Sequence, residues 1–136
     1  MPLVDASVWI DFLADRPTPE VGELDRLLNQ GGLVYTCGIV LTEVLQGFRA
    51  DEDYRKTLSR FDDLVYIAMR RRTFLAAADI YRSLRRKGIT IRKSVDCMIA
   101  AVAIEHHLPL LHNDRDFDPI ERHCGLKVVK VRPPKP

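Results

Sequence analysis

The sequence predicts an α/β fold in which short buried strands and helices alternate around an open parallel sheet. The first observation lies at the N-terminus, where the apolar pair Leu3-Val4 stops at Asp5 and a helical apolar pattern begins at once. A short apolar run with a polar end suits a strand that is covered on both faces. The second observation is that Leu108–Leu111 leads to Asp114 in the same order. Because ligands of open parallel sheets bind outside the carboxyl ends of the strands, both aspartates are candidate site residues.

Length and composition predict one domain, over residues 1–131, followed by a disordered tail at 132–136. A chain of 136 residues can bury roughly two thirds of the surface that its unfolded form exposes. Cys37, Cys97 and Cys124 are far apart and form no C-x-x-C pair, so we expect core thiols rather than disulfides or a zinc site. No signal peptide precedes the first strand and no apolar run approaches the ~18 residues of a membrane span. We therefore expect a soluble, cytoplasmic protein with no membrane partner.

Helical periodicity and turn residues predict the elements of the first half in order. Two prolines near residue 18 exclude a helix there, and a pair of glycines ends the helix that follows. We expect a helix from Val8, a loop over 15–19, a helix over Glu20–Gln30, a strand over Leu33–Tyr35, and a helix over Thr36–Phe48 that Thr36 caps.

The second half continues the alternation. A helix begins at Asp51 with acidic residues where the helix dipole favours them, and a strand follows over Leu64–Ile67. A long amphipathic helix then spans Thr73–Lys87 and ends at Gly88. Its predicted inward face holds Phe74, Ala77, Ala78, Tyr81 and Leu84. We further expect an apolar helix over Ser94–Ile104, a strand over Leu108–Leu111, a helix that Asp118 caps before Pro119, and a last strand over Gly125–Val131.

Four carboxylates are the polar exceptions in elements that are otherwise predicted to be buried. Asp5 and Asp114 end strands, whereas Glu43 and Asp96 each stand on an apolar helix. A buried carboxylate is costly unless it is paired or bound to a metal. Ordinary structural roles remain open as alternatives, because Asp5 or Ser7 could cap the first helix and Asp96 could complement a helix dipole. For Glu43, a narrow exposed stripe of its helix is the alternative.

Convergence of these four carboxylates would call for a cation. Each close pair of like charges repels by roughly 4 kcal/mol at an effective dielectric of about 20. Oxygen ligands without paired His or Cys favour Mg²⁺, or Mn²⁺, over zinc. We expect Asp5, Asp96 and Asp114 to bind the metal, which would activate a water molecule for attack on a phosphodiester. Ser7 and Asp116 are predicted accessory residues.

The charge distribution predicts a polyanionic partner. The net charge is only +2, yet residues 1–69 carry six basic and twelve acidic side chains, whereas residues 70–93 carry nine basic and one acidic. Cations at the end of a helix gain ~0.3–1 kcal/mol each from its dipole, and the basic excess here is larger than that effect requires. A solvated helix surface is the alternative for any single arginine. The candidates for contact with a phosphate backbone are Arg85, Arg86, Lys87, Arg92 and Lys93.

The acidic residues stand in four short motifs, which are Asp5-x-Ser7, Thr42-Glu43-Val44-Leu45-x-Gly47, Asp96-Cys97-Met98-Ile99-Ala100-Ala101 and Asn113-Asp114-x-Asp116-Phe117. In this order and spacing, over residues 3–131, they resemble the PIN-domain nucleases, and among these the VapC-type toxin ribonucleases of toxin-antitoxin pairs. The resemblance implies a three-layer α/β/α sandwich, Mg²⁺-dependent endoribonuclease activity, a homodimer and inhibition by a small cognate antitoxin of the VapB type. It implies that the catalytic residues are Asp5, Glu43, Asp96 and Asp114, with Asp116 as an accessory.

Two other functions remain open on the sequence. A phosphohydrolase could use Asp5 as a covalent nucleophile, but the second aspartate expected two residues later is replaced by Ser7. A non-catalytic module could use the acids as caps and the basic helix to grip nucleic acid or a partner. Such a module would bind RNA equally well in EDTA and would not cleave it.

Overall fold

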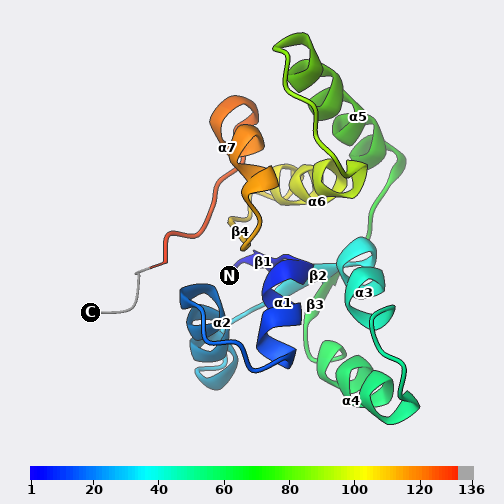
Figure 1. Cartoon of the computed structure of the whole chain (residues 1–136), viewed down its shortest axis with the longest axis vertical. Helices are drawn as coiled ribbons and strands as arrows, with labels where there is room; N and C mark the ends of the chain where they lie inside the picture. The colour runs from blue at the N-terminus through cyan, green and yellow to red at the C-terminus, as the bar shows by residue number, and fades with distance from the viewer. Residues whose placement is uncertain (132–136) are drawn as a thin grey trace.

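A parallel sheet of four short strands lies at the centre of the computed structural model, which describes residues 1–131 (Figure 1). The strands are β1 (Leu3–Val4), β2 (Tyr35–Cys37), β3 (Val65–Ile67) and β4 (Leu110–Leu111), and their order is β3-β2-β1-β4. All three pairings are parallel, which confirms the predicted mainly parallel sheet. The chain runs outward from β1 to β3 and then returns to place β4 on the other side of β1. The strand order therefore reverses between β1 and β4, where ligands of open sheets bind.

Helices cover both faces of this sheet. Figure 1 shows α5, α6 and α7 on one side and α1, α2 and α4 on the other. The predicted three-layer α/β/α sandwich is therefore confirmed. In the described residues the helices are α1 (Ala6–Leu13), α2 (Pro19–Asn29), α3 (Gly38–Leu45), α4 (Asp51–Phe61), α5 (Arg71–Arg86), α6 (Ser94–Glu105) and α7 (Asp118–Cys124), with a 3-10 turn η1 at Arg115–Phe117.

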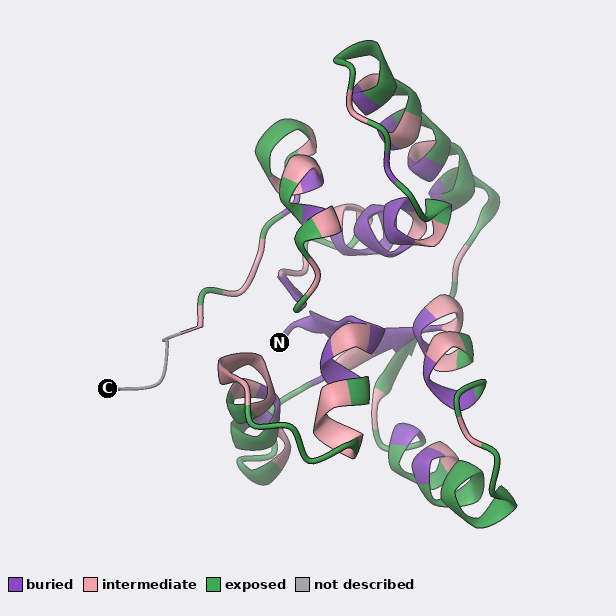
Figure 2. Cartoon of the chain, viewed as in Figure 1, coloured by how far each residue is buried: buried purple, intermediate pink, exposed green. Residues whose placement is uncertain are grey.

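The core follows the sheet and α6, as the buried residues in Figure 2 show. Both residues of β1 are fully buried, because helices pack on each face of the central strand. Along α6 the side chains of Ala100, Ala101 and Ala103 are buried and small, so the helix axis can approach its neighbours closely. The fully buried Ile99 and Val102 of the same helix add larger side chains to this packing.

The predicted boundary between β2 and α3 is wrong by two residues. Thr36, which was expected to stop the strand and cap the helix, lies inside β2 and pairs with Tyr66 of β3. Its backbone is therefore engaged in the sheet, and its side chain is 1% exposed. The helix begins at Gly38, with Cys37 at the cap position and no side-chain cap. Strand pairing here overrides the local preference of threonine for a helix cap.

The buried face of α5 also differs from the prediction. Phe74 and Ala78 were expected to point inward, but both are exposed, Phe74 by 44%. The buried face instead holds Thr73, Ala77, Ile80 and Leu84. The Thr73 hydroxyl donates to the carboxylate of Glu105 at the end of α6, 3.1 Å away. This bond turns the polar Thr73 toward α6, which a search for apolar periodicity could not anticipate.

Two predictions near the C-terminus are corrected as well. Asp118 does not cap α7 but begins it in helical conformation, because η1 runs directly into the helix and puts Phe117 at the cap position. The strand expected over Gly125–Val131 is reduced to one parallel bridge between Leu110 and Val128. The predicted tail at 132–136 lies outside the described residues. Across the part that the structure describes, we find no helix with both the length and the apolar character that a membrane crossing requires.

Two leucines of α5 provide a matched test of the observed face. Leu84 is fully buried and Leu75 is 49% exposed. We expect Leu84→Ala to lower the free energy of unfolding by about 2–5 kcal/mol, because it leaves a cavity against α6 and loses buried area. Leu75→Ala should change it by about 0.5 kcal/mol or less. Urea denaturation followed by circular dichroism measures both, and equal losses would contradict the orientation of α5.

Candidate functional site

The candidate site lies where the carboxyl ends of β1 and β4 meet. Asp5 directly follows β1 and is 4% exposed, and its backbone N–H donates to the Leu111 carbonyl of β4 at 2.9 Å. The Asp5 side chain caps α1, since Oδ2 accepts from the backbone N–H of Ser7 at 3.0 Å and from its hydroxyl at 2.6 Å. The capping role left open by the sequence is thus present. It also fixes the direction of the Asp5 carboxylate at the sheet edge.

Ser7 and Asn113 connect the two strand ends. The Asn113 N–H donates to Ser7 Oγ at 3.0 Å, and its side-chain amide donates to Asp11 Oδ2 at 3.1 Å. The loop after β4 is therefore held against α1. Sequence reasoning missed this role of Asn113, for which the only signal was its place beside Asp114 in the last motif.

Three carboxylates of this edge approach one another closely enough to share a cation. Asp96, Asp114 and Asp116 each offer an oxygen, and these atoms all lie within 4.8 Å of one another. Asp96 comes from the first turn of α6, Asp114 from the loop after β4, and Asp116 from η1. The structure thus brings the predicted accessory Asp116 into this group. Asp5, predicted as a metal ligand with Asp96 and Asp114, lies outside it.

Asp96 is the most strongly perturbed member of the group. It is 2% exposed, and its Oδ2 has no hydrogen-bond partner among the residues that the structure describes. Burial raises the pKa of Asp96 to about 7, an effect that Asp5, Asp114 and Glu43 reinforce and Lys93 opposes. All four predicted carboxylates therefore act on one another electrostatically. A carboxylate that only complements the dipole of a helix would be exposed to solvent. The buried Asp96 carboxylate therefore needs a further positive partner when it is ionised.

The other two carboxylates differ in environment. Glu43 of α3 is half-buried, and burial followed by repulsion from Asp5 raises its pKa. For Asp114, partial burial acts to raise the pKa, but hydrogen bonds from the Asp116 N–H, at 2.9 Å, and from Lys93 outweigh it and leave the pKa below its ordinary value. Asp114 is therefore ionised when the protein is near neutral pH.

Two of the predicted RNA contacts, Lys93 and Arg92, form ion pairs with these carboxylates. Lys93 Nζ is 3.2 Å from Asp114 Oδ2 and 3.8 Å from Asp96 Oδ1. Arg92 donates twice to Asp116 Oδ2, at 3.0 and 3.2 Å. The spacing of three residues between Lys93 and Asp96 at a helix start was the available signal for the first pair.

The remaining basic candidates belong to another surface. Arg85, Arg86 and Lys87 are exposed at the C-terminal end of α5, and the Arg85 guanidinium lies over the ring of Tyr81, 5.6 Å from its centroid. These three side chains are available to an external anion.

The donor set fits a hard divalent cation. The three clustered residues offer only oxygen, and Asp96 adds a buried oxygen that lacks a partner. Such ligands suit Mg²⁺ or Mn²⁺. Asp96, Asp114 and Asp116 are the residues that could hold the ion, with Asp5 and Glu43 at the margin.

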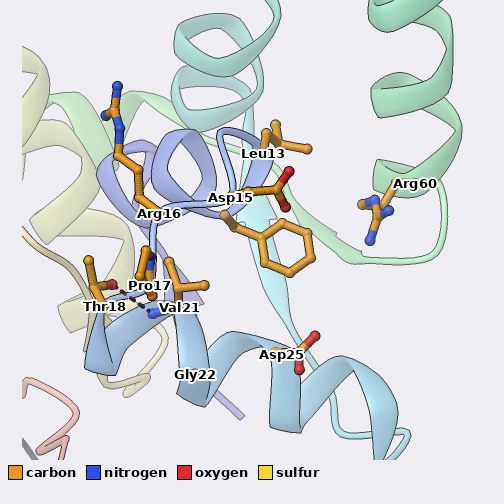
Figure 3. A pocket seen from close by; sticks show the side chains of 10 residues that line it. Leu13, Asp15, Arg16, Pro17, Thr18, Val21, Gly22, Asp25 and Arg60 are labelled. Carbon is orange, nitrogen blue, oxygen red and sulfur yellow. Dashed lines mark hydrogen bonds between the residues drawn. The ribbon is translucent and has the colours of Figure 1, made fainter. Parts of the chain in front are cut away.

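A separate pocket of about 580 Å³ lies between α1, α2 and Arg60 (Figure 3). Its lining includes Phe12, Val21 and Asp25, and none of the clustered carboxylates takes part. The Arg60 guanidinium stacks over the Phe12 ring, 5.2 Å from its centroid. This pocket therefore belongs to the opposite layer of the fold from α6.

The fold and the site together define an α/β/α domain with a carboxylate cluster at the switch point of a parallel sheet. The chain belongs to the PIN-domain family, because the sequence model of that family, described as "PIN domain", matches residues 3–122. This confirms the resemblance that the four motifs indicated.

Named relatives and solved structures agree with this assignment. The chain is 34% identical over 142 residues to Ribonuclease VapC11 of Mycobacterium tuberculosis, covering 97% of this chain and 100% of the relative. It is 35% identical over 96 residues to Ribonuclease VapC21 of the same species, covering 68% and 69%. The fold is similar to VapBC2 from Rickettsia felis bound to a promoter DNA fragment (TM-score 0.74, 19% identity, 93% and 96% covered). It is also similar to the M. tuberculosis toxin VapC20, described as cleaving the sarcin-ricin loop (TM-score 0.65, 20% identity, 98% and 100% covered).

The raised pKa of Asp96 predicts an unusual pH dependence of stability. The folded protein holds the Asp96 proton up to about pH 7, whereas the ordinary value is 3.8. The folded state therefore binds more protons than the unfolded chain between these values, and stability falls as pH rises through them. Without metal, we expect Asp96 to account for a loss of about 1–4 kcal/mol between pH 4 and pH 8. Asp96→Asn should remove this loss and melt higher than the wild type at pH 7.5 in EDTA.

Asp118→Asn is the matched control, because Asp118 is exposed on α7. Thermal and urea unfolding across this pH range, in EDTA, measure all three proteins. If Asp96→Asn kept the wild-type slope, or melted lower at pH 7.5, the charge on Asp96 would not be the destabilising one.

Proposed function

We propose that this protein is a divalent-metal-dependent endoribonuclease and the toxin of a toxin-antitoxin pair. The observation that carries the proposal is that Asp96, Asp114 and Asp116 each offer an oxygen within 4.8 Å of the others, while Asp96 is buried and its Oδ2 lacks a partner among the described residues. It is supported by the similarity to relatives that are named as VapC ribonucleases. We propose Mg²⁺ as the metal, with Mn²⁺ able to replace it, and a single domain over residues 1–131.

In this proposal the carboxylates of the candidate site have different roles in phosphodiester hydrolysis. Asp96, Asp114 and Asp116 would hold the cation, which when bound lowers the pKa of water and offsets charge on the scissile phosphate. Asp5 is oriented by Ser7, and therefore presents its charge to the same edge in a fixed direction. The half-buried Glu43, whose pKa is raised, is suited to accept or hold a proton beside the phosphate. We propose Asp5, Glu43, Asp96 and Asp114 as the catalytic residues, with Asp116 as a ligand and Ser7 as an orienting residue.

An acidic cluster alone would repel a nucleic acid. The basic segment over residues 70–93 compensates for this, since it carries nine basic side chains and one acidic. We propose that Arg85, Arg86 and Lys87 bind the RNA backbone from the end of α5. Arg92 and Lys93 lie nearer the cleavage point, against the carboxylates.

The partners follow from the same comparisons. Two similar structures are described as VapBC2 bound to a promoter DNA fragment and as a toxin-antitoxin complex from Klebsiella pneumoniae, the latter at a TM-score of 0.64 and 21% identity. We propose that this chain likewise binds a small VapB-type antitoxin and forms a homodimer in the cytoplasm. Exposed apolar side chains at Phe74 and Leu75 of α5, 44% and 49% exposed, offer a surface for such contacts.

The activity is tested by matched substitutions of aspartates. We expect purified wild-type protein to cleave RNA in Mg²⁺ and to lose activity in EDTA. Asp5→Asn and Asp96→Asn should each reduce the cleavage rate by at least about 100-fold, because a lost cation ligand or neighbour weakens metal binding and charge stabilisation. Asp118→Asn should stay within about threefold of wild type, since Asp118 is exposed and outside the cluster.

Three results would contradict the proposed chemistry. RNA binding that EDTA leaves intact, without cleavage in Mg²⁺, would favour the non-catalytic module. Equal inactivation by Asp118→Asn, in a protein folded by circular dichroism, would place the site elsewhere. A trapped phosphorylated Asp5 would indicate the phosphohydrolase, although the hydrogen bonds from Ser7 occupy Oδ2 of this carboxylate.

The backbone contact makes a separate prediction. Replacing Arg85, Arg86 and Lys87 together by glutamine should weaken RNA binding and flatten the slope of log K against log salt by up to about 3, since each phosphate contact releases counterions. Mn²⁺ affinity should stay unchanged. Binding is measured by fluorescence anisotropy in EDTA at several salt concentrations, and an unaltered slope would return these residues to the solvated surface.

A further inference from the structure

Lys93 stands at the start of α6 with its ammonium among the carboxylates of the site. Its Nζ donates to Asp114 Oδ2 at 3.2 Å and lies 3.8 Å from Asp96 Oδ1. The Asp114 carboxylate is about one-fifth exposed and Asp96 is buried, so the ammonium is the positive charge next to an otherwise acidic pair. Lys93 itself is 49% exposed, and its side chain can therefore swing out into solvent.

Arg92 completes this arrangement on the third carboxylate. It holds Asp116 Oδ2 through two guanidinium nitrogens, and the Arg92 side chain is 78% exposed. Each member of the oxygen cluster thus has a basic side chain from the same dipeptide beside it. These basic groups lie against the same three carboxylates that a metal ion would bind, so they compete with the ion for those carboxylates.

We propose that Lys93 is the resident counter-ion of the cluster, which a divalent cation must displace. This proposal rests on the proposed metal-dependent function. The exchange breaks the contacts of Nζ with Asp114 and Asp96 and leaves the ammonium protonated. A divalent ion carries twice the charge of the ammonium, so it offsets more of the repulsion among the carboxylates.

Such an exchange gives Lys93 two effects. In the metal-free protein, Lys93 limits the repulsion among the carboxylates and supports the fold. The same side chain lowers metal affinity, because its contacts must be broken before the ion can bind.

The test compares Lys93→Met with Lys87→Met, a matched lysine that is exposed at the end of α5. Mn²⁺ binding to the full chain is measured by titration calorimetry at pH 7.5. We expect Lys93→Met to bind Mn²⁺ about three- to fivefold more tightly than wild type, because roughly one exposed ion pair no longer has to be broken. Lys87→Met and the charge-retaining Lys93→Arg should keep the wild-type dissociation constant within about twofold.

Thermal scans provide a readout independent of metal affinity. In EDTA, Lys93→Met should melt lower than Lys87→Met, and saturating Mn²⁺ should abolish that difference. If the wild type binds Mn²⁺ and Lys93→Met binds it with equal or weaker affinity, Lys93 is not displaced by the metal. That result would overturn this proposal and leave the proposed function intact. The absence of Mn²⁺ binding from both proteins would instead overturn the metal-dependent function and this proposal together.

Discussion

The parallel pairing of β1 with β4 determines where the chemistry of this protein can occur. Leu3 pairs with Leu110 and Val4 with Leu111, and the Asp5 N–H reaches the Leu111 carbonyl at 2.9 Å. Because parallel strands end at the same edge, this register brings the residue after β1 and the loop after β4 together. The helices α3 and α6 then only need to point one carboxylate each toward that edge. A shift of either strand by one residue would turn the side chains that follow it to the other face.

The crowding of negative charge at this edge is balanced by neighbouring groups rather than by solvent. Asp96 is nearly inaccessible, and its burial favours the protonated acid near neutral pH. Lys93 instead favours its charged form. Burial acts to lower the pKa of Lys93, but Asp96 and Asp114 outweigh this effect and raise it. Acid and base therefore stabilise each other's charged form. These ion pairs link the start of α6 to the loop after β4.

Sequence reasoning predicted the convergence of Asp96 and Asp114 better than it predicted the edges of the elements. Asp96 and Glu43 stood out because a charge on an apolar helix is costly, and this cost is visible without coordinates. The orientation of α5 was not predictable in the same way, because the bond from Thr73 to Glu105 joins segments 32 residues apart. Pairing of Thr36 with β3 and of Arg92 with Asp116 likewise depends on long-range placement. Composition showed that a basic segment exists, but it could not show that Arg92 and Lys93 form ion pairs with the acids of the cluster.

The small residues of α6 have a consequence for how this sequence can evolve. The helix can lie close to its neighbours because Ala100, Ala101 and Ala103 are small and buried. Asp96 lies on the same helix, one turn before Ala100. A larger side chain at Ala100 or Ala103 would displace α6 from its neighbours, and the Asp96 carboxylate would move with the helix. Such a change would alter the geometry at the strand ends without touching any residue there. Substitutions along this stretch are therefore constrained twice, by the packing of the helix and by the position of the Asp96 carboxylate.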